Sequence, residues 1–259
     1  MIVWTIANQK GGVGKTTTCV SLVGWMKKSD MKVLLIDTDP HASLTNYFGY
    51  DSDELSHTLF NLFTEQKFDA EFLRELVLKT DYDGIDIMPG SLALSTLDRT
   101  LGNEDGIGNI LRKALETLSG DYDAVLIDCP PVLGVLMVNA IGAASRVIVP
   151  CQTEFLALKG LERMMKTFDV MTASTGRQFS YLIVPTMYDR RTRASVQSLE
   201  SIRKDYSASL WGNYIPIDTK FRDSSQQHVP LPLLDPESRG SLAYHDLFVS
   251  MMKLEGIEL

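Results

Sequence analysis

A glycine-rich segment near the start of the chain holds the residue types that bind phosphate. It runs from Lys10 to Thr17 and reads Lys-Gly-Gly-Val-Gly-Lys-Thr-Thr, between a strand-like run and a helix-like one, as a phosphate-binding loop requires. Glycines allow backbone N–H groups to wrap around phosphate oxygens without Cβ clashes. The helix N-terminus adds positive potential at the same place. The pattern predicts a nucleotide site whose loop consists of Gly11, Gly12, Val13, Gly14, Lys15, Thr16 and Thr17.

Three side chains of this loop indicate the ligand. Lys15 can reach the β- and γ-phosphates of a nucleoside triphosphate, and the Thr16 hydroxyl can ligate Mg²⁺. Thr17 is well placed to bond the α-phosphate. We therefore expect ATP or ADP, together with Mg²⁺, as the cofactors. The competing interpretation is a plain glycine-rich turn before a helix, and the order of strand, Gly-Lys-Thr and helix disfavours it.

Carboxylates follow two apolar, strand-like runs. Residues 34–36 lead to Asp37 and Asp39, and residues 125–127 lead to Asp128. Ligands of parallel α/β sheets bind beyond the carboxyl ends of the strands, so we expect the three carboxylates to converge on the Mg–phosphate region. There a carboxylate can hold Mg²⁺ or orient an attacking water. Any one of them alone could equally be a helix cap or turn residue, but three beside a phosphate loop favour function.

Alternating strand-like and helix-like segments surround these residues. Apolar runs predict strands at Ile2–Ala7, Val33–Ile36, Ile85–Met88, Ala124–Ile127, Val147–Val149 and Tyr181–Val184. Periodic segments predict helices near Lys15–Lys28, Ala70–Leu78, Ile107–Leu118, Leu156–Ala173, Ala194–Tyr206 and Ser241–Lys253. Such alternation indicates an α/β fold, a doubly wound, mostly parallel sheet with helices on both faces. We expect one domain over residues 1–259, with Tyr47–Thr80 as its least regular part, an insertion near the active face.

Composition excludes several classes of protein. The chain has 259 residues and a formal net charge of -8, so its bulk charge does not suggest a binder of nucleic acid or anionic membranes. Its three cysteines and four histidines are scattered, which argues against a disulfide framework or a zinc site. No run is apolar for long enough to span a bilayer and no targeting segment is visible. We expect a cytoplasmic protein.

The segment from Lys10 to Thr17 matches, residue for residue, the hallmark of the deviant-Walker ATPases, and the chain resembles that family of ParA and MinD partition and positioning proteins. The resemblance implies a homodimer when ATP is bound, in which Lys10 crosses the interface and touches the partner's phosphates. It also implies slow ATP hydrolysis that an adaptor protein stimulates. For Lys10 alone, the competing interpretation is a solvated loop lysine.

The resemblance extends over nearly the whole chain. Residues 37–45 look like the family's first switch, which implies that Asp39 positions the hydrolytic water. Residues 128–131 look like the second switch, with Asp128 on the metal side, so the expected metal ligands are Thr16, Asp37 and Asp128. The segment 234–240 is also similar to the family's pattern.

One departure from the family pattern points to a subgroup. Residues 41–43 read His-Ala-Ser where ParA proteins usually have Gln-Gly-Asn. With the Ala-Asn-Gln-Lys opening of residues 7–10, this variant looks most like ParA-like proteins encoded with chemotaxis genes. That implies a polar or chemotaxis-array protein as partner and enrichment at the cell pole.

By resemblance, the adenine pocket involves Thr186, Met187 and the loop from Pro216 to Asp218. The alternative is an ordinary strand end followed by a turn. Residue types alone do not separate the two interpretations.

DNA is a further expected partner, bound weakly and without sequence specificity. Arg191 aligns with a DNA-contact arginine of the family, Lys220 stands where another basic residue usually lies, and Arg222 is close to it. However, Ile217 replaces an arginine that many ParA proteins carry, and a solvated helix face explains these cations equally well. The tail from His245 to Leu259 has few cations and predicts a core-packing helix rather than a membrane anchor.

Two other classes share this kind of fold. Metabolic enzymes such as cobyrinic acid amidases and dethiobiotin synthetases need an acceptor pocket and often a glutaminase domain, which we do not expect here. Iron–sulfur ATPases need paired cysteines, and the spacing of Cys19, Cys129 and Cys151 argues against that class.

Overall fold

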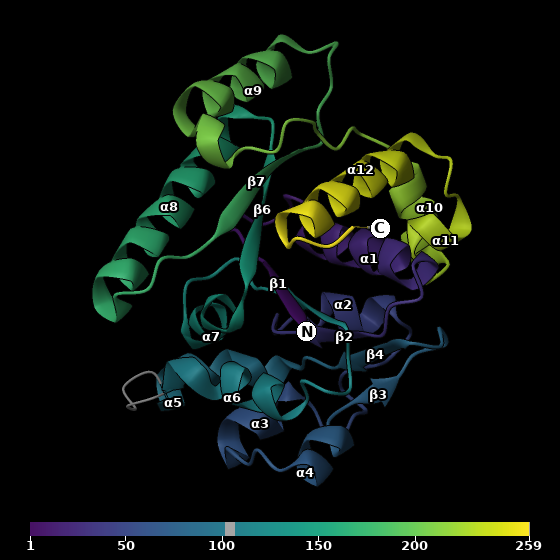
Figure 1. The fold of residues 1–259 in the computed structure, drawn as a ribbon, viewed down its shortest axis with the longest axis vertical. Coiled ribbons are helices and arrows are strands. Elements are labelled where there is room, and N and C mark those ends of the chain that lie inside the picture. The colour runs from purple at the N-terminus through teal and green to yellow at the C-terminus, as the bar shows by residue number, and fades with distance from the viewer. Residues whose placement is uncertain (102–106, 259) are drawn as a thin grey trace. The chain divides into compact units, whose positions relative to one another are not determined.

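The computed structural model describes residues 1–101 and 107–258 (Figure 1). The chain divides into two compact units, each described by itself below. Unit 1 consists of Met1–Thr5 and Met26–Ser145, and unit 2 consists of Ile6–Trp25 and Arg146–Leu259. The expected single domain over 1–259 includes residues 102–106 and 259, which lie outside the described residues, and it stays a prediction.

Parallel strands form the centre of unit 1. In its part of the sheet the order is β3-β4-β2-β5-β1, with β1 at Ile2–Ile6, β2 at Val33–Asp37, β4 at Ile85–Met88 and β5 at Ala124–Asp128. Strand β2 pairs in parallel with both β4 and β5. All residues of β2, β4 and β5 are buried, as expected for strands covered on both faces.

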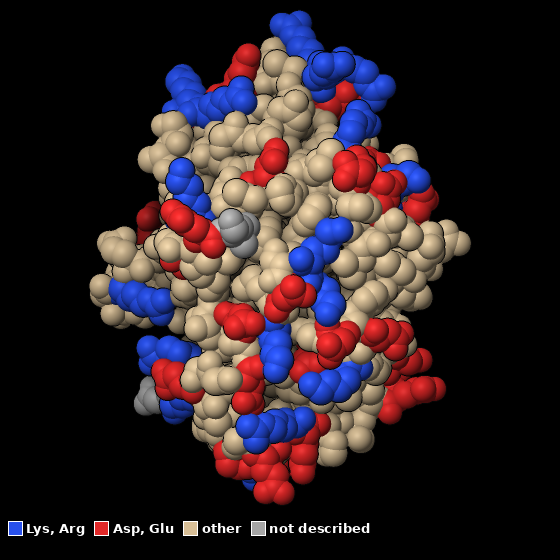
Figure 2. Space-filling view, turned by 45° about the vertical axis from the view of Figure 1, so that its right-hand side comes forward, with Lys and Arg blue, Asp and Glu red and all other residues tan. Residues whose placement is uncertain are grey.

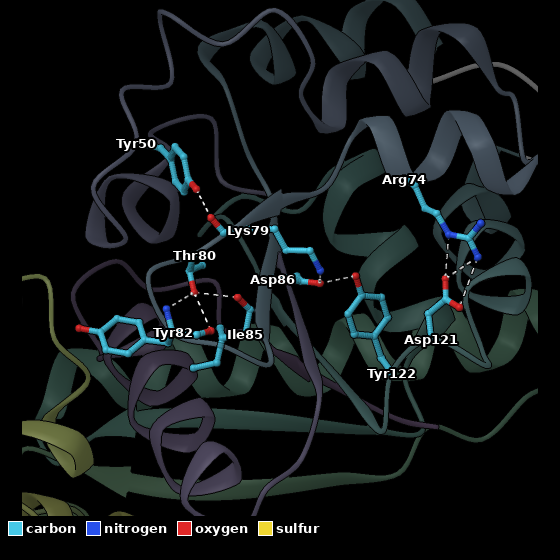
Figure 3. A network of polar contacts seen from close by, with 9 residues as sticks. All are labelled: Tyr50, Arg74, Lys79, Thr80, Tyr82, Ile85, Asp86, Asp121 and Tyr122. Atoms are coloured by element: carbon cyan, nitrogen blue, oxygen red, sulfur yellow. Dashed lines mark hydrogen bonds and ion pairs between the residues drawn. The ribbon is translucent and has the colours of Figure 1, made fainter.

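A short edge strand, β3 (Leu78–Lys79), runs antiparallel to β4 and was not expected from the sequence. The Lys79 ammonium lies 2.7 Å from the buried Asp86 carboxylate, to which the Tyr122 hydroxyl also donates at 2.8 Å. The Tyr50 hydroxyl donates to the Lys79 carbonyl, and Figure 3 shows these side chains converging on the strand pair. Polar contacts between distant segments therefore hold β3, because two residues carry too little hydrophobic pattern to define a strand.

The helices of unit 1 are mostly short: α2 (Ser43–Tyr47), α3 (Leu59–Glu65), α4 (Ala70–Glu75), α5 (Leu97–Leu101), α6 (Ile110–Thr117) and α7 (Val135–Ala143). The segment 47–80, expected to be irregular, contains α3 and α4, whose N-caps are the Thr58 and Asp69 side chains. The helix expected from Ile107 begins as a 3₁₀ turn and becomes α6 at Ile110. Helix α7 was missed because its residues are almost all apolar and show no helical period.

Unit 2 pairs β6 (Arg146–Gln152) in parallel with β7 (Tyr181–Thr186). Its helices are α8 (Phe155–Thr175), α9 (Arg193–Tyr206), α10 (Lys220–Gln226), α11 (Leu231–Leu234) and α12 (Arg239–Leu254). Figure 1 shows α8 beside α9. Helix α1 (Lys15–Lys28) has the expected bounds, and most of it belongs to this unit.

Helix α12 packs on α1 inside unit 2. The Trp25 indole donates to the Ser241 carbonyl at 3.0 Å, and the Thr18 and Tyr244 hydroxyls lie 2.8 Å apart. The apolar residues Leu247, Phe248, Met251 and Met252 are buried. The prediction that this tail is a core-packing helix is confirmed. Over the part of the chain that the structure describes, no helix is long and apolar enough to cross a membrane.

Candidate nucleotide site

The segment between β1 and α1 forms a tight loop that ends at Lys15, the first residue of α1. Gly12 and Gly14 have φ angles of 75° and 91°, which strain any residue with a Cβ. A Cβ added at Gly11 or Gly12 would meet no atom within 4 Å. The loop is thus an open cradle above a helix N-terminus, and its size and dipole suit phosphate oxygens.

The two lysines of the loop lie at its two ends. The Lys15 side chain is buried, and its Nζ donates to the Lys10 carbonyl at 3.3 Å. Lys10 is half-buried, and its backbone N–H donates to Asn8 Oδ1 at 3.1 Å. The Lys15 ammonium therefore spans the cradle, where it can neutralise a bound phosphate.

A hydroxyl on β7 anchors the loop. Thr186 Oγ1 donates to the Val13 carbonyl at 2.9 Å, and both residues are buried. The Thr153 hydroxyl lies 3.4 Å from the Thr186 carbonyl and 2.5 Å from the Ser195 hydroxyl on α9. Sequence reasoning named Thr186 for the base pocket but missed this anchor, because a threonine at a strand end gives no sign of its partner 173 residues away.

A cavity of about 670 Å³ adjoins the loop in unit 2. The expected base residues Met187, Pro216 and Asp218 line it, together with Gly14, Thr17, Thr186, Phe221, Arg222 and Tyr244. Met187 has a φ of 53°, and strained backbone of this kind is concentrated at binding sites. Such a volume beside a phosphate cradle is of the size that binds a nucleoside.

Asp218 holds this cavity's wall in place. Its Oδ1 accepts the Lys220 N–H at 3.0 Å, and its Oδ2 accepts the Gly240 N–H at 2.9 Å. The Tyr188 N–H donates a hydrogen bond to the Ile215 carbonyl, and the Ile217 N–H donates one to the Tyr188 carbonyl. The wall from Pro216 to Asp218 is therefore tied to α10, α12 and the residues after β7.

The expected metal-side carboxylates belong to unit 1. Asp37 and Asp128 are opposite each other in the β2–β5 register, at the carboxyl ends of these strands. Asp37 is fully buried and accepts from the Thr45 N–H and hydroxyl, both at 2.8 Å. Burial raises the pKa of Asp37 to about 6, although these hydrogen bonds and one from the Asp39 N–H oppose the shift.

These residues fit Mg²⁺ better than a metal caged by protein ligands. Among residues 1–101 and 107–258, no group of three or more His, Cys, Asp or Glu side chains could hold a metal ion. Mg²⁺ usually takes one or two carboxylates and fills its other positions with water and phosphate oxygens. Within unit 1, Asp37 and Asp128 could supply carboxylates of this kind.

Residues 37–45, the segment expected to form the first switch, have an unusual backbone. Asp39 is half-buried, and its Oδ1 accepts the His41 N–H at 3.0 Å. Ala42 has a φ of 51° just before α2, a conformation that glycine adopts without strain. The departure from the family's Gln-Gly-Asn pattern thus places alanine where the backbone favours glycine.

The expected DNA residues are not gathered in one cavity. Arg191 lines a second cavity of about 630 Å³, with Tyr188, Arg190, Tyr214, Ile217 and Arg239. Arg222 lines the nucleotide cavity instead, and the Lys220 Nζ lies within 4 Å of Asp223 and Asp235. Ile217 is half exposed, which leaves an apolar surface where the family often places a cation.

Charge is divided unevenly between the two units. Unit 1 has 9 Lys and Arg residues against 20 Asp and Glu residues, a net charge of −11, and unit 2 has 16 against 13, a net charge of +3. The drawn face in Figure 2 shows Lys and Arg in small groups beside Asp and Glu. The net charge of -8 therefore combines an acidic unit 1 with a slightly basic unit 2, and no continuous basic surface is visible on the drawn face.

Comparisons with known proteins agree on one family. A family model described as an AAA domain matches residues 1–181. The chain is 36% identical over 245 residues to the chromosome partitioning protein ParA of Caulobacter vibrioides, covering 93% of this chain and 90% of that protein. It is 31% identical over 243 residues to the sporulation initiation inhibitor protein Soj of Bacillus subtilis, covering 93% and 94%.

A solved structure is similarly close. Cobyrinic acid a,c-diamide synthase from Mycobacterium smegmatis, with a bound ATP analog and magnesium, superposes with a TM-score of 0.85 at 30% identity. The match covers 99% of this chain and 96% of that one. The proteins similar to this chain therefore carry names from two functional classes, partition proteins and a metabolic synthase.

Proposed function

We propose, from the premise that this chain belongs to the ParA/MinD family of P-loop ATPases, that it is an ATPase whose ATP-bound homodimer positions or partitions cargo in a bacterial cell. One observation carries the proposal. An intact phosphate cradle has Lys15 across it and a second lysine, Lys10, at its entrance. A single-chain ATP site needs only one of these cations, so the second favours a site that a partner copy completes.

The residues of the cradle fit a nucleotide. Gly12 and Gly14 shape the loop, Lys15 spans it, and the adjoining cavity is large enough for a nucleoside. When bound, Mg-ATP would supply the phosphoanhydride bond whose hydrolysis changes the protein's binding state. The loop N–H groups and Lys15 would then bind the phosphates of the nucleotide in their own subunit.

The other roles follow the family pattern. We assign Lys10 to the phosphates of the partner copy, Thr16, Asp37 and Asp128 to the metal side, and Asp39 to the hydrolytic water. Asp39 is accessible enough to contact water, being half-buried. A carboxylate that orients water accelerates hydrolysis without contributing to phosphate affinity. Hydrolysis would be slow, with an adaptor protein to stimulate it.

The proposed cargo is the chemotaxis array at the cell pole. Support comes from the His-Ala-Ser variant at residues 41–43 and the Ala-Asn-Gln-Lys opening. Fluorescent tagging in a motile bacterium would show polar foci, and deletion of the gene would misplace the arrays. A protein spread over the nucleoid, with normal arrays in the deletion strain, would instead favour partition of DNA.

A partition protein that binds DNA is the second candidate, and the net charge of +3 on unit 2 favours it. Binding would need ATP because a dimer doubles each cationic group and adds avidity. It would be weak and salt-sensitive, since few cations are available.

An amide-forming metabolic ATPase is the third candidate, favoured by the similarity to cobyrinic acid a,c-diamide synthase. A screen of ATPase rate against small-molecule acid acceptors separates it from the others. Strong acceptor-dependent stimulation of turnover would establish a metabolic enzyme.

Light scattering during size-exclusion chromatography tests the main proposal. The purified protein should be monomeric with Mg-ADP and dimeric with Mg-ATP or a slowly hydrolysed analogue. An identical molar mass under both conditions would contradict the proposal.

A further inference from the structure

At Gly160, helix α8 closely approaches Lys10, the residue at the entrance of the phosphate loop. A Cβ atom added at Gly160 would lie 2.7 Å from Lys10 Cβ and 3.2 Å from Asn8 Oδ1. Gly160 is buried within unit 2. The contact involves the first carbon of the lysine side chain and not its flexible end, so rotation of the lysine cannot relieve the clash.

The loop side of this contact is also held in place. Asn8 is fully buried, its Nδ2 donates to the Pro150 carbonyl at 2.7 Å, and its Oδ1 accepts the Lys10 N–H. The next residue, Gln9, donates to the Thr167 hydroxyl on α8 at 2.5 Å. Asn8 is therefore fastened to β6 and Gln9 to α8, and Lys10 is held through Asn8, so a shift of Lys10 would strain these hydrogen bonds.

A glycine in this place is unfavourable for the helix itself. Gly160 is the sixth residue of the 21-residue α8, where alanine would have the higher helix propensity. Its φ is not in the left-handed region, since it is absent from the positive-φ glycines. The backbone conformation thus does not require glycine, and only the approach of Lys10 and Asn8 does.

We propose that Gly160 is a positioning residue for Lys10, because its missing Cβ lets α8 hold the backbone and Cβ of that lysine at the loop entrance. This inference rests on the proposed function, in which Lys10 reaches the phosphates of a partner copy. With its backbone and Cβ fixed, the rest of the Lys10 side chain would extend toward the partner copy from a fixed position. In catalytic sites, a misplacement of about 1 Å can slow the reaction by up to about a hundredfold, so the position of this lysine matters.

The first test concerns the geometry and does not depend on ATP. Gly160→Ala should lower the melting temperature in the wild-type background, since a buried Cβ is forced on Lys10. In a Lys10→Gly background, that carbon is gone and only the 3.2 Å approach to Asn8 Oδ1 remains, so the same substitution should lower the melting temperature clearly less, because helix propensity offsets part of the remaining cost. An equal loss of stability in both backgrounds would overturn the contact. Gly212→Ala is the matched control, because a Cβ there meets no atom within 4 Å.

The second test concerns function and uses the full chain with fluorescent ADP and with an ATP analogue. Gly160→Ala should weaken ATP-dependent dimerisation by about tenfold or more, while ADP affinity changes by less than about threefold, because the loop backbone from Gly11 to Thr17 is not displaced directly. Gly212→Ala should change neither quantity. Normal dimerisation of Gly160→Ala, or an equal loss of ADP affinity, would overturn a positioning role.

The two proposals fail separately. Dimers formed normally by Lys10→Ala would contradict the assigned role of Lys10, whatever the stability measurements show. Background-independent destabilisation by Gly160→Ala would contradict the α8 contact, even if Lys10 proved essential for the dimer.

Discussion

Arg191 forms a two-point ion pair with Asp189, two residues before it, through Nε at 2.9 Å and Nη2 at 2.8 Å. The same fork of donors is what an arginine offers to phosphate. The guanidinium holds the pKa of Asp189 at about 2, so the carboxylate stays charged near neutral pH and keeps the arginine paired. A DNA phosphate must therefore compete with this carboxylate.

The ion pair predicts that Asp189→Asn strengthens ATP-dependent DNA binding, since it removes the competing charge. Arg191→Glu should abolish that binding without altering nucleotide affinity. Fluorescence anisotropy with a labelled duplex measures both effects, and the salt slope should change by about 0.9 for each phosphate that the protein no longer neutralises. Asp205→Asn is the control, as it removes an exposed charge of the same unit. Equal gains from both neutralisations would show that only net charge matters.

Substitutions of the two loop lysines should affect different properties, nucleotide affinity for Lys15 and dimerisation for Lys10. Lys15→Ala should weaken binding of ATP and ADP by at least about tenfold, because it removes the cation that spans the cradle. Lys10→Ala should leave ADP affinity nearly intact and abolish the ATP-dependent dimer. Nucleotide titration and light scattering distinguish the two, and ATP-dependent dimers of Lys10→Ala would refute the assignment.

Asp39→Ala should bind ATP and dimerise but hydrolyse about a hundredfold more slowly, since it removes the group assigned to orient water. The dimer should then persist long after ATP is added, as shown by light scattering alongside phosphate release. A variant that stays monomeric with ATP would mean that Asp39 is needed for the switch structure rather than for the chemical step.

Ala42→Gly should remove about 1 kcal/mol of backbone strain, because glycine adopts the φ of 51° without the steric cost of a Cβ, and the net gain in stability should be smaller because glycine loses more conformational freedom on folding. Urea unfolding gives the change, provided that the slope with denaturant is unchanged. Ala42 is buried, so the lost methyl group offsets part of the gain. A net loss of stability would mean that this methyl contributes more than the strain costs.

Alkaline pH should destabilise the protein. Burial raises the pKa of Cys151 from 9.0 to about 12, so the unfolded chain loses this proton first. The free energy of unfolding should therefore fall between pH 9 and 12, by up to about 1.4 kcal/mol per pH unit for this group. All three cysteines are buried, and a thiol reagent at pH 8 should react with them only after denaturation. Rapid reaction of the native protein would contradict the burial.

The sequence predicted the elements that carry local signals. Helix α1 has its expected bounds because the phosphate loop defines where it starts and its last turn ends in Lys27 and Lys28. Asp37 and Asp128 end neighbouring strands as predicted, because the apolar run before each one is a buried strand. By contrast, β3 depends on Asp86 and Tyr122, which lie far from it in the sequence.

The same distinction applies to the site. The glycine and lysine spacing of the loop is visible in the sequence, whereas the candidate base loop at Pro216 to Asp218 was expected only from the family resemblance. The Thr186 hydrogen bond to Val13 is not visible in the sequence, nor is the approach of Gly160 to Lys10. Both are tertiary contacts between segments about 150 or more residues apart, for which neither periodicity nor residue type gives a signal.

Gly160 also bears on attempts to make this protein more stable. Natural sequences are mostly free of conflict between local preference and global fold. At position 160, however, alanine would favour the helix, whereas the contact with the phosphate loop requires glycine. Such a position is locally frustrated, and a redesign that maximises helix propensity would replace this glycine first. The redesigned protein should fold, but Lys10 would no longer be held at the loop entrance, so a redesign chosen by helix propensity alone would sacrifice function.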